Sequence, residues 1–418
     1  MLPTPAPVSP TTFLVPRGVD LFRWCVVAAD QFSSSPEYWS RVDDLVADAP
    51  SSLRMIVPEV FLGTESEQQL AERVAATHSA MSSYLANVLV PHSNSVVYVE
   101  RRTSRVERRR SLVVALDLEQ YSYRPGDEVD VRASEETVLE RIPAREAVRS
   151  NASLELPHVQ VLFDDPSDRA FGPIERAAHS GALDQLYETD LMLDGGSVKG
   201  WKLEGSSPLW EAASQALDRL DVADRGFRFI VGDGNHSLAA ARSHWARLKQ
   251  SGASDNHPAR FALVELIEVH DPGLVMEPIH RWLRGISFDQ LKAAFNAWNA
   301  EHPDMSREKV TLVTPNEAVE FSVAQPGTLI IEAVQHVVDG LLDELALDPA
   351  HACEYIHGED EIQRLVSADG GIGILLPSID RSALFDYVAE RGTMPRKSFS
   401  LGEAEEKRYY LECRAITD

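Results

Sequence analysis

Hydrophobic positions follow two different periods along the chain, and together they predict a mixed α/β (α+β) protein. Apolar runs of strand length recur, and the clearest are SVVYVE, SLVVALDLEQY, VQVLF and RFALVELIEV. Residues 66–88 and 288–300 instead space their apolar side chains as amphipathic helices do. Strands interspersed with helices in this way predict a sheet with helices packed on its faces.

The length and the pattern indicate more than one domain. A chain of 418 residues is longer than a single hydrophobic core usually supports. The succession of strands and helices restarts near residue 286, so we expect a larger region over 13–285 and an α+β extension over 286–418. The proline-rich residues 1–12 are predicted to be a disordered lead-in.

Composition narrows the class of partner. The chain has 40 basic and 65 acidic residues, and a net charge of −25 disfavours binding to nucleic acids or anionic membranes, which are polyanions. Its three cysteines are widely spaced, as in a reduced cytoplasmic protein, and no apolar run is long enough to cross a membrane. We therefore expect a cytoplasmic protein that binds a small molecule, and leave open whether it forms a homo-oligomer.

The stretch FIVGDGNHSLAAAR carries the strongest chemical signal in the chain. A buried strand runs into a turn, and an alanine-rich helix begins directly after it. Gly232 and Gly234 permit the backbone angles and the close approach that a phosphate needs. The first amides of a helix lack partners within the helix, and the helix dipole attracts anions to the same point.

Four polar residues complete this predicted phosphate-binding turn. Asp233 can hold a magnesium ion or accept a proton, and His236 can donate to a phosphate oxygen or transfer a proton. Asn235 and Ser237 add further hydrogen-bonding groups. The alternative interpretation is a tight structural turn with a histidine at the helix start, and spacing alone favours neither. The turn lacks the Gly-Lys-Ser/Thr of a Walker loop and the third glycine of a Rossmann fingerprint.

A phosphate site needs positive charge, and three basic stretches are candidates. ERIPAREAVR supplies Arg141 and Arg145, which share a helix face if the chain around Pro143 is helical. MPRKSFS supplies Arg396 and Lys397 beside two serines. Glutamates near both stretches leave a salt-bridge role equally open. The run ERRTSRVERRR has six arginines, but we predict a hairpin tip there and interpret the run as a solvated turn.

Carboxylates at strand ends are the candidates for binding magnesium and for activating a hydroxyl group. Asp30 follows the predicted strand RWCVVAAD, Glu119 ends VVALDLE, and two aspartates end VQVLF. Together with the turn they suit a magnesium–nucleotide site, with Asp30 or Asp233 as the catalytic carboxylate and Asp233 and Glu119 as metal ligands. The histidines and acids around EVHDPGLVMEPIH, with His158, match no compact zinc spacing, and we interpret them as structural.

Two resemblances follow from these residues. GDGNHSLAAAR resembles the Asp-Gly-x-His-Arg signature of the ParB/sulfiredoxin-like superfamily, in which the motif opens a helix and binds nucleotide phosphates. Over most of its length the chain also resembles an uncharacterised family, domain of unknown function 1015. The segments that carry this second resemblance are WCVVAADQFSSSPEYW, RASEETVLERIPAR, LELPHVQVLFDDP, FIVGDGNHSLAAAR, MEPIHRWL and MPRKSFSLGEAEEKRYYLE.

The resemblance implies a ParB/sulfiredoxin-like core in which Asp233, Gly234 and His236 bind phosphate. Ser237 stands where the superfamily has arginine, so the positive charge must come from elsewhere. The implied activity is nucleotide-dependent phosphotransfer to a small hydroxylated metabolite, with ATP, ADP or CTP and Mg²⁺ as cofactors and free-serine kinases as the nearest analogy. The alternatives are a phosphatase acting on a small phosphoester and a non-catalytic nucleotide- or ligand-binding regulatory protein.

Overall fold

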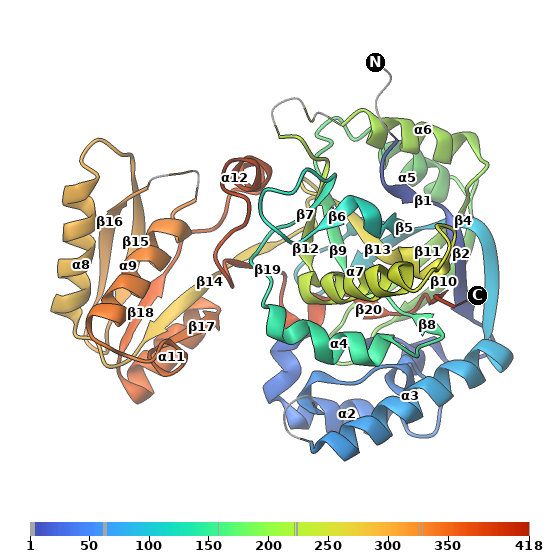
Figure 1. Ribbon diagram of the computed structural model, residues 1–418, viewed down its shortest axis with the longest axis horizontal. Helices are drawn as coiled ribbons and strands as arrows, with labels where there is room; N and C mark the ends of the chain where they lie inside the picture. The colour runs from blue at the N-terminus through green and yellow to red at the C-terminus, as the bar shows by residue number, and fades with distance from the viewer. Residues whose placement is uncertain are drawn as a thin grey trace. The chain divides into compact units, whose positions relative to one another are not determined.

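The computed structural model describes residues 5–61, 65–157, 159–220, 222, 225–325, 327 and 329–417 (Figure 1). Contacts along the chain divide it into two compact units. The first unit comprises Met1–Ala133, Thr137–Leu274 and Gly402–Asp418, and the second comprises Ser134–Glu136 and Val275–Leu401. The last segment of the chain therefore returns to the first unit. Each unit combines helices with a sheet, which confirms the mixed α/β class.

An eleven-stranded sheet forms the framework of the first unit. Its main path is β10 (Asp184–Asp190), β11 (Ser197–Glu204), β4 (Leu89–Arg102), β5 (Arg109–Asp117), β13 (Phe261–Glu268), β9 (Gln160–Phe163), β12 (Phe229–Asp233), β7 (Val131–Ala133) and β6 (Tyr121–Ser122). β13 pairs with β9 in parallel, whereas β12 pairs with β9 antiparallel. The predicted hairpin of β4 and β5 is confirmed.

Two further strands join this sheet near the start of the chain. β1 (Val8–Ser9) pairs with β5, and β2 (Thr11–Pro16) pairs with β4. The predicted disordered lead-in through residue 12 is thus wrong for the residues from Val8 onward. Pairing with strands far along the chain holds this proline-rich segment in place, and local composition does not reveal such pairing.

The two faces of the first sheet bury different elements, because side chains alternate along each strand. Tyr98, Leu112 and Phe163 pack on one face with α5 (Gly172–His179), α6 (Pro208–Asp218) and α7 (Asn235–Gln250). Val97, Val113 and Leu263 pack on the other face, where the core also includes Met81 of α3 (Glu67–Asn87), Leu411 and Cys413. The C-terminal segment therefore lies on the face opposite α7.

Short strands tie this C-terminal segment to the rest of the first unit. β20 (Tyr409–Tyr410) pairs with β3 (Val26–Val27), and β21 (Arg414–Ala415) pairs with β8 (Leu154–Glu155). The strand predicted at RWCVVAAD is only these two residues of β3. α1 (Leu21–Trp24) precedes it because Asp20 caps a helix there by accepting the Phe22 amide at 3.0 Å.

The chain around Pro143 is helical, which is the condition for Arg141 and Arg145 to share a helix face. A 3₁₀ turn, η5 (Leu139–Arg141), leads into α4 (Ile142–Arg149), and Pro143 lies in the first turn of α4. Proline is tolerated there because the first amides of a helix have no partner within the helix. α3 begins at a capping box on Ser66, and α6 begins at Ser207, whose side chain accepts the Trp210 amide.

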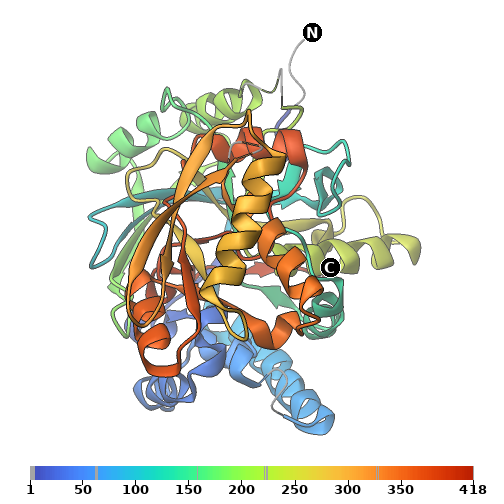
Figure 2. The same ribbon diagram turned by 90° about the vertical axis from the view of Figure 1, so that its left-hand side faces the viewer.

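The second unit is built on a six-stranded sheet. Its strands are β16 (Ala318–Ala324), β15 (Arg307–Val313), β18 (Ile372–Leu375), β14 (Met276–Leu283) and β17 (Cys353–His357), and β19 (Phe399–Leu401) pairs with β14. α8 (Phe288–Glu301) and α9 (Ile331–Glu344) pack against each other and against β16 (Figure 2). α11 (Glu359–Asp369) packs on β14 and β18. Among the helices described in both units, none combines the length and the hydropathy needed to cross a membrane.

Candidate functional site

The predicted strand–turn–helix is present at the end of β12. Gly234 adopts a left-handed conformation (φ 84°) and is the N-cap of α7. A Cβ atom at this position would lie 3.0 Å from the Val159 Cα, so both the backbone angle and the space favour glycine. The Asp233 Oδ1 accepts the Gly234 amide at 2.9 Å, which fixes one carboxylate oxygen at the turn.

The start of α7 has no side-chain cap, unlike the starts of α3, α6 and α8. The helices α2 (Pro36–Val46), α9 and α11 also lack one. Ser66, Ser207 and Ser287 each accept an amide of the first turn of their helix through a side-chain oxygen. Gly234 has no side chain with which to do so. A helix N-terminus without a side-chain cap is suited to an acceptor from outside the helix, such as a phosphate oxygen.

His236 in the first turn of α7 has a defined orientation. Its Nε2 accepts the Val138 amide at 3.1 Å, so in the neutral ring the proton is on Nδ1. Ile142 packs on Ala239 and Ala240, which keeps the 138–142 segment beside the turn. Arg141 lies on this segment, three residues after the contact with His236, and its side chain is exposed.

The cation nearest to the turn, among the contacts described, is Lys407. Its Nζ lies 3.2 Å from the Asp233 Oδ2, and only 7% of its side chain is exposed. Sequence analysis did not select this residue. The basic pair in EEKRYYLE is a weak signal on its own, and only the return of the C-terminal segment to the first unit brings it to the turn.

Next to Lys407, Arg408 begins a buried polar cluster on the same face of the sheet. Its Nε lies 3.6 Å from the Glu265 Oε2. Glu265 also accepts hydrogen bonds from Ser111 Oγ at 2.7 Å and from Gln160 Nε2 at 3.1 Å. Gln160 is the register partner of Asp233 in β12 and of Glu265 in β13, so the cluster and the turn are neighbours across the sheet.

Arginines from the β4–β5 hairpin complete this cluster. Arg109 Nη2 lies 3.9 Å from the Glu265 Oε2, and Arg101 donates to backbone oxygens, including that of Glu406 at 2.9 Å. The interpretation of the six-arginine run as a solvated turn is therefore wrong for Arg101, Arg109 and Arg110, which are at most 8% exposed. Only Arg102, Arg105 and Arg108 are exposed. Because side chains alternate along β5, Arg110 lies on the opposite face of the sheet, where it pairs with Asp271.

The cluster shifts the acidity of its members. Burial opposes ionisation of Glu265, but Arg408 and Arg109 outweigh it and lower the pKa of Glu265 to about 2. For Arg101, burial and the nearby Arg109 lower the pKa to about 9. Arg101 therefore stays protonated near pH 7, and its described hydrogen-bond acceptors are carbonyl oxygens of the backbone.

The predicted acids occupy different places. Asp30 begins the 3₁₀ turn η1 (Asp30–Ser34), which packs against η7 (Ala404–Glu406) directly before Lys407. The structure does not describe the side chain of Asp30. Glu119 contacts Lys249 at 3.1 Å and also accepts a hydrogen bond from Trp245. These contacts lie on the third and fourth turns of α7, so the structure does not bring Glu119 together with Asp233.

The remaining predicted basic residues are placed as follows. Arg145 lies one turn after Arg141 and donates to the Arg141 oxygen at 3.3 Å. Arg396 and Lys397 belong to the second unit, where Arg396 Nε lies 3.6 Å from Glu136 Oε2. The Lys397 amide donates to Glu135, and burial raises the pKa of that carboxyl group.

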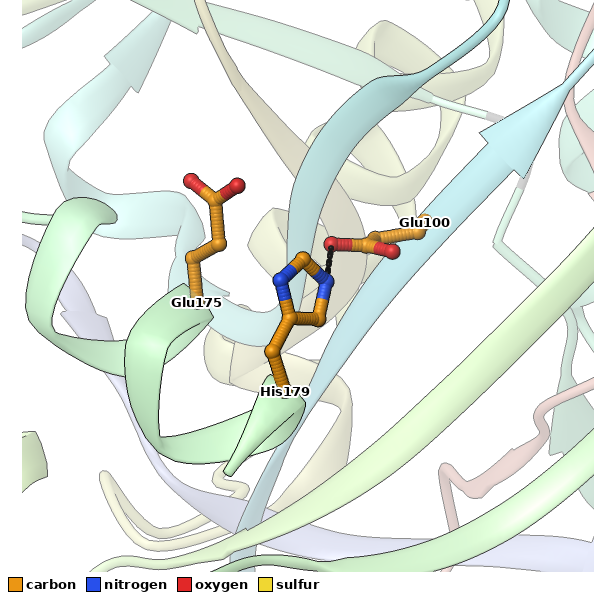
Figure 3. A group of neighbouring side chains, drawn as sticks. All are labelled: Glu100, Glu175 and His179. Carbon is orange, nitrogen blue, oxygen red and sulfur yellow. Dashed lines mark hydrogen bonds and ion pairs between the residues drawn. The ribbon is translucent and has the colours of Figure 1, made fainter. Parts of the chain in front are cut away.

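Two groups of described residues have the spacing of metal ligands. In the first, Glu100 of β4 lies beside His179 and Glu175 of α5 (Figure 3). Arg108 and Arg110 already pair with Glu175. In the second, Asp164 pairs with Arg225 at 2.6 Å and with His270 at 2.9 Å, while Glu268 accepts backbone amides. Cations and backbone amides of the protein thus satisfy these carboxylates, so neither group needs a metal ion to explain it.

The histidines and acids interpreted as structural have structural partners where they are described. Asp271 pairs with Arg110, and His280 accepts the Leu376 amide at 3.1 Å. Burial lowers the pKa of His280 to about 4, so the ring is neutral near pH 7. His158 lies outside the described residues.

Comparison with protein families assigns the chain to one of them. Residues 13–345 match the model of a family described as "Protein of unknown function (DUF1015)". The chain belongs to this family. The match covers the turn, the helix that follows it and most of the second unit, and it ends before Lys407. A comparison with curated proteins finds no match.

Several solved structures are similar to the chain at low identity. Free serine kinase in complex with AMP is 10% identical, with a TM-score of 0.35, over 73% of this chain and 91% of that one. A conserved hypothetical protein from Pyrococcus furiosus is 12% identical (TM-score 0.33, 73% and 95%). SbnI from Staphylococcus aureus, truncated at its C-terminus, is 9% identical (TM-score 0.34, 69% and 82%). At these scores the likeness transfers no activity to the DUF1015 chain.

Proposed function

We propose that this DUF1015 protein transfers a phosphoryl group from a nucleotide to a small hydroxylated metabolite. The turn from Gly232 to Ser237 would hold the nucleotide phosphates, with Asn235 and Ser237 as further donors. The observation that carries the proposal is Lys407, a nearly buried cation 3.2 Å from Asp233 at a helix start that has no side-chain cap. It supplies the positive charge that Ser237, in the place of an arginine, does not.

The chemistry divides among a few residues of the first unit. The acceptor hydroxyl oxygen attacks the terminal phosphorus, the bond from phosphorus to the bridging oxygen breaks, and the nucleotide leaves with one phosphate fewer. Asp233 or Asp30 takes the hydroxyl proton. Lys407 and the Nδ1–H of His236 neutralise charge on the phosphoryl oxygens, and Arg141 is placed to reach the same phosphates from the neighbouring segment.

Magnesium is part of the proposal because nucleotide phosphates are usually bound with it. Asp233 is half-buried and has one oxygen on a backbone amide and the other on Lys407, so it can offer one ligand when Lys407 turns to phosphate. Glu119 contacts α7 at Trp245 and Lys249, too far from the turn to share that ion. When bound, Mg²⁺ supplies charge neutralisation of the phosphates. We also infer that the first unit has the ParB/sulfiredoxin-like core that the motif implies.

Nucleotide binding is tested by thermal unfolding with ATP, ADP or CTP, each with Mg²⁺, on the full chain. A ligand at a hundred times its dissociation constant adds about 2.7 kcal/mol, which raises the melting temperature by several degrees. We expect such a shift for one nucleotide, and its loss in Lys407→Met. Lys309→Met is the matched control, because Lys309 pairs with Glu320 on the exposed surface of the second unit.

The outcomes separate the candidate functions. A shift in the wild type and in Lys309→Met but not in Lys407→Met supports a nucleotide on the turn, and product formation in a screen of small alcohols, including serine, then supports transfer. Binding without turnover favours a regulatory protein, and release of phosphate from phosphoesters favours a phosphatase. No shift with any nucleotide would contradict the proposal.

A further inference from the structure

A second feature of the first unit, a cluster of buried charged side chains, points to a ligand. We call it the arginine cluster: Arg101, Arg109 and Arg408 with Glu265, Glu412 and Gln160. All six residues are at most 5% exposed. Glu412 is held by Arg408 Nη2 at 2.6 Å and by the Tyr187 hydroxyl, and Glu265 is held by Ser111 and Gln160. The cluster lies on the sheet face that the C-terminal segment covers.

The charges of the arginine cluster do not balance. It contains three guanidinium groups and two carboxylates, and the carboxylate of Glu406 is turned to Thr103 and to the Glu403 amide. Burying a cation without a carboxylate partner is costly, since the protein interior solvates it poorly. The cluster is therefore suited to one more negative charge than the chain itself supplies.

Several polar atoms of the cluster also lack hydrogen bonds within the described protein. These atoms are Arg101 Nε, Arg109 Nε and Nη2, Arg408 Nε and Nη1, and Gln160 Oε1. Each belongs to a side chain that is at least nine-tenths buried. Buried donors and acceptors in native proteins nearly always have a partner, so this group of five donors and one acceptor marks the place of a missing molecule.

We propose that the arginine cluster binds the carboxylate of a small molecule that also carries a hydrogen-bond donor. The adjacent Nε and Nη2 donors of Arg109 match the two oxygens of a carboxylate, and Arg408 adds single donors beside them. The Gln160 oxygen accepts from an ammonium or hydroxyl group of the same molecule. An α-hydroxy or α-amino acid has this combination of groups.

The position of the cluster connects it to the turn. Gln160 is the register partner of Asp233, and Lys407 and Arg408 are consecutive residues that contact Asp233 and Glu265 respectively. A carboxylic acid held by the cluster would therefore present its hydroxyl group toward Asp233. This last step rests on the proposed function and makes the bound acid the phosphoryl acceptor, whereas the binding itself does not depend on a nucleotide.

The test uses three probes that share a small hydroxylated skeleton, without any nucleotide. L-Serine has a carboxylate and an ammonium group, L-lactate keeps the carboxylate, and ethanolamine is serine without the carboxylate. Binding to the full chain is measured by calorimetry at millimolar concentrations. We expect serine and lactate to bind and ethanolamine to bind at least tenfold more weakly. Equal affinity for all three probes, or no binding of any, would overturn the proposal, the latter meaning that water fills the cluster.

Two substitutions test whether the arginine cluster is the site of binding. Arg109→Lys keeps the charge but loses the fork of donors, and Gln160→Glu keeps the shape but adds a charge that repels a carboxylate. Both should weaken serine and lactate at least tenfold while circular dichroism stays unchanged. Arg110→Lys is the matched control, because Arg110 is the next residue of β5 but faces the opposite side of the sheet. Equal losses in Arg109→Lys and Arg110→Lys would contradict the proposal. Carboxylate binding without any nucleotide effect would remove the proposed function and leave this site.

Discussion

Lys407 and Asp233 form an ion pair of 3.2 Å between the C-terminal segment and the glycine turn. The pair joins two stretches that neither local pattern nor spacing relates to each other. Because the lysine is nearly buried and the aspartate is one-third exposed, the solvent side of the pair is the carboxylate. Under the proposed function, a phosphate at the start of α7 would meet both groups and would compete with Asp233 for the ammonium group.

Gly234 should be sensitive to substitution for two separable reasons. Gly234→Ala places a Cβ atom 3.0 Å from Val159 in a left-handed conformation, and we expect it to lower the free energy of unfolding by about 2–3 kcal/mol. Gly252→Ala has the same kind of backbone strain (φ 95°) with open space around the Cβ atom, and it should cost about 1–2 kcal/mol. Urea unfolding of both variants measures the difference. Equal costs would mean that the approach of Val159 is unimportant.

His236 should combine a structural and a chemical role that different replacements separate. Its Nε2 accepts the half-buried Val138 amide, so His236→Ala should cost about 1 kcal/mol. His236→Gln can offer an oxygen near the same point and should restore most of that stability. We expect neither variant to show the nucleotide shift of the wild type, because both lack the Nδ1–H. A full shift in the glutamine variant would limit His236 to holding Val138.

Glu265 should make stability depend on acid. Its pKa in the folded protein is about 2, because Arg408 and Arg109 outweigh the effect of burial, whereas an unfolded glutamate titrates near 4.3. A lowered folded pKa adds stability above the unfolded pKa, and this stability is lost as the pH falls from about 5 toward 2. The contribution is about 3 kcal/mol. The free energy of unfolding, measured with denaturant, should therefore fall more steeply from pH 6 to pH 3 in the wild type than in Glu265→Gln. Parallel curves would show that the arginines do not stabilise the ionised form of Glu265.

The strand, the turn and the helix around Gly234 could be predicted because each depends on neighbouring residues. The same holds for the helix expected over residues 66–88, which is present as α3. The arginines of the β4–β5 hairpin could not be placed correctly, because a charged run at a hairpin tip is usually solvated. Here the C-terminal segment covers the tip, and Arg101 donates to the backbone oxygens of residues 405–407.

The candidate site shows the same division. Asp233, Gly234 and His236 could be selected from one short stretch, and the 138–142 segment beside them was also a candidate. Lys407, Arg408, Glu265 and Gln160 come from three other elements that meet only through strand order and through the return of the chain to its first unit. No spacing along the sequence encodes such meetings.

The return of Gly402–Asp418 to the first unit also has a consequence for biosynthesis. The ribosome completes the second unit before it makes the strand β20 and the lysine that the first unit needs. Folding of nascent chains usually proceeds from the N-terminus, domain by domain, but here the first unit is complete only after the second unit has been made. A product that terminates early, anywhere before Lys407, would carry the glycine turn without its cation. A chain cut short in this way would also lack Arg408, so both the candidate site and the arginine cluster would be incomplete.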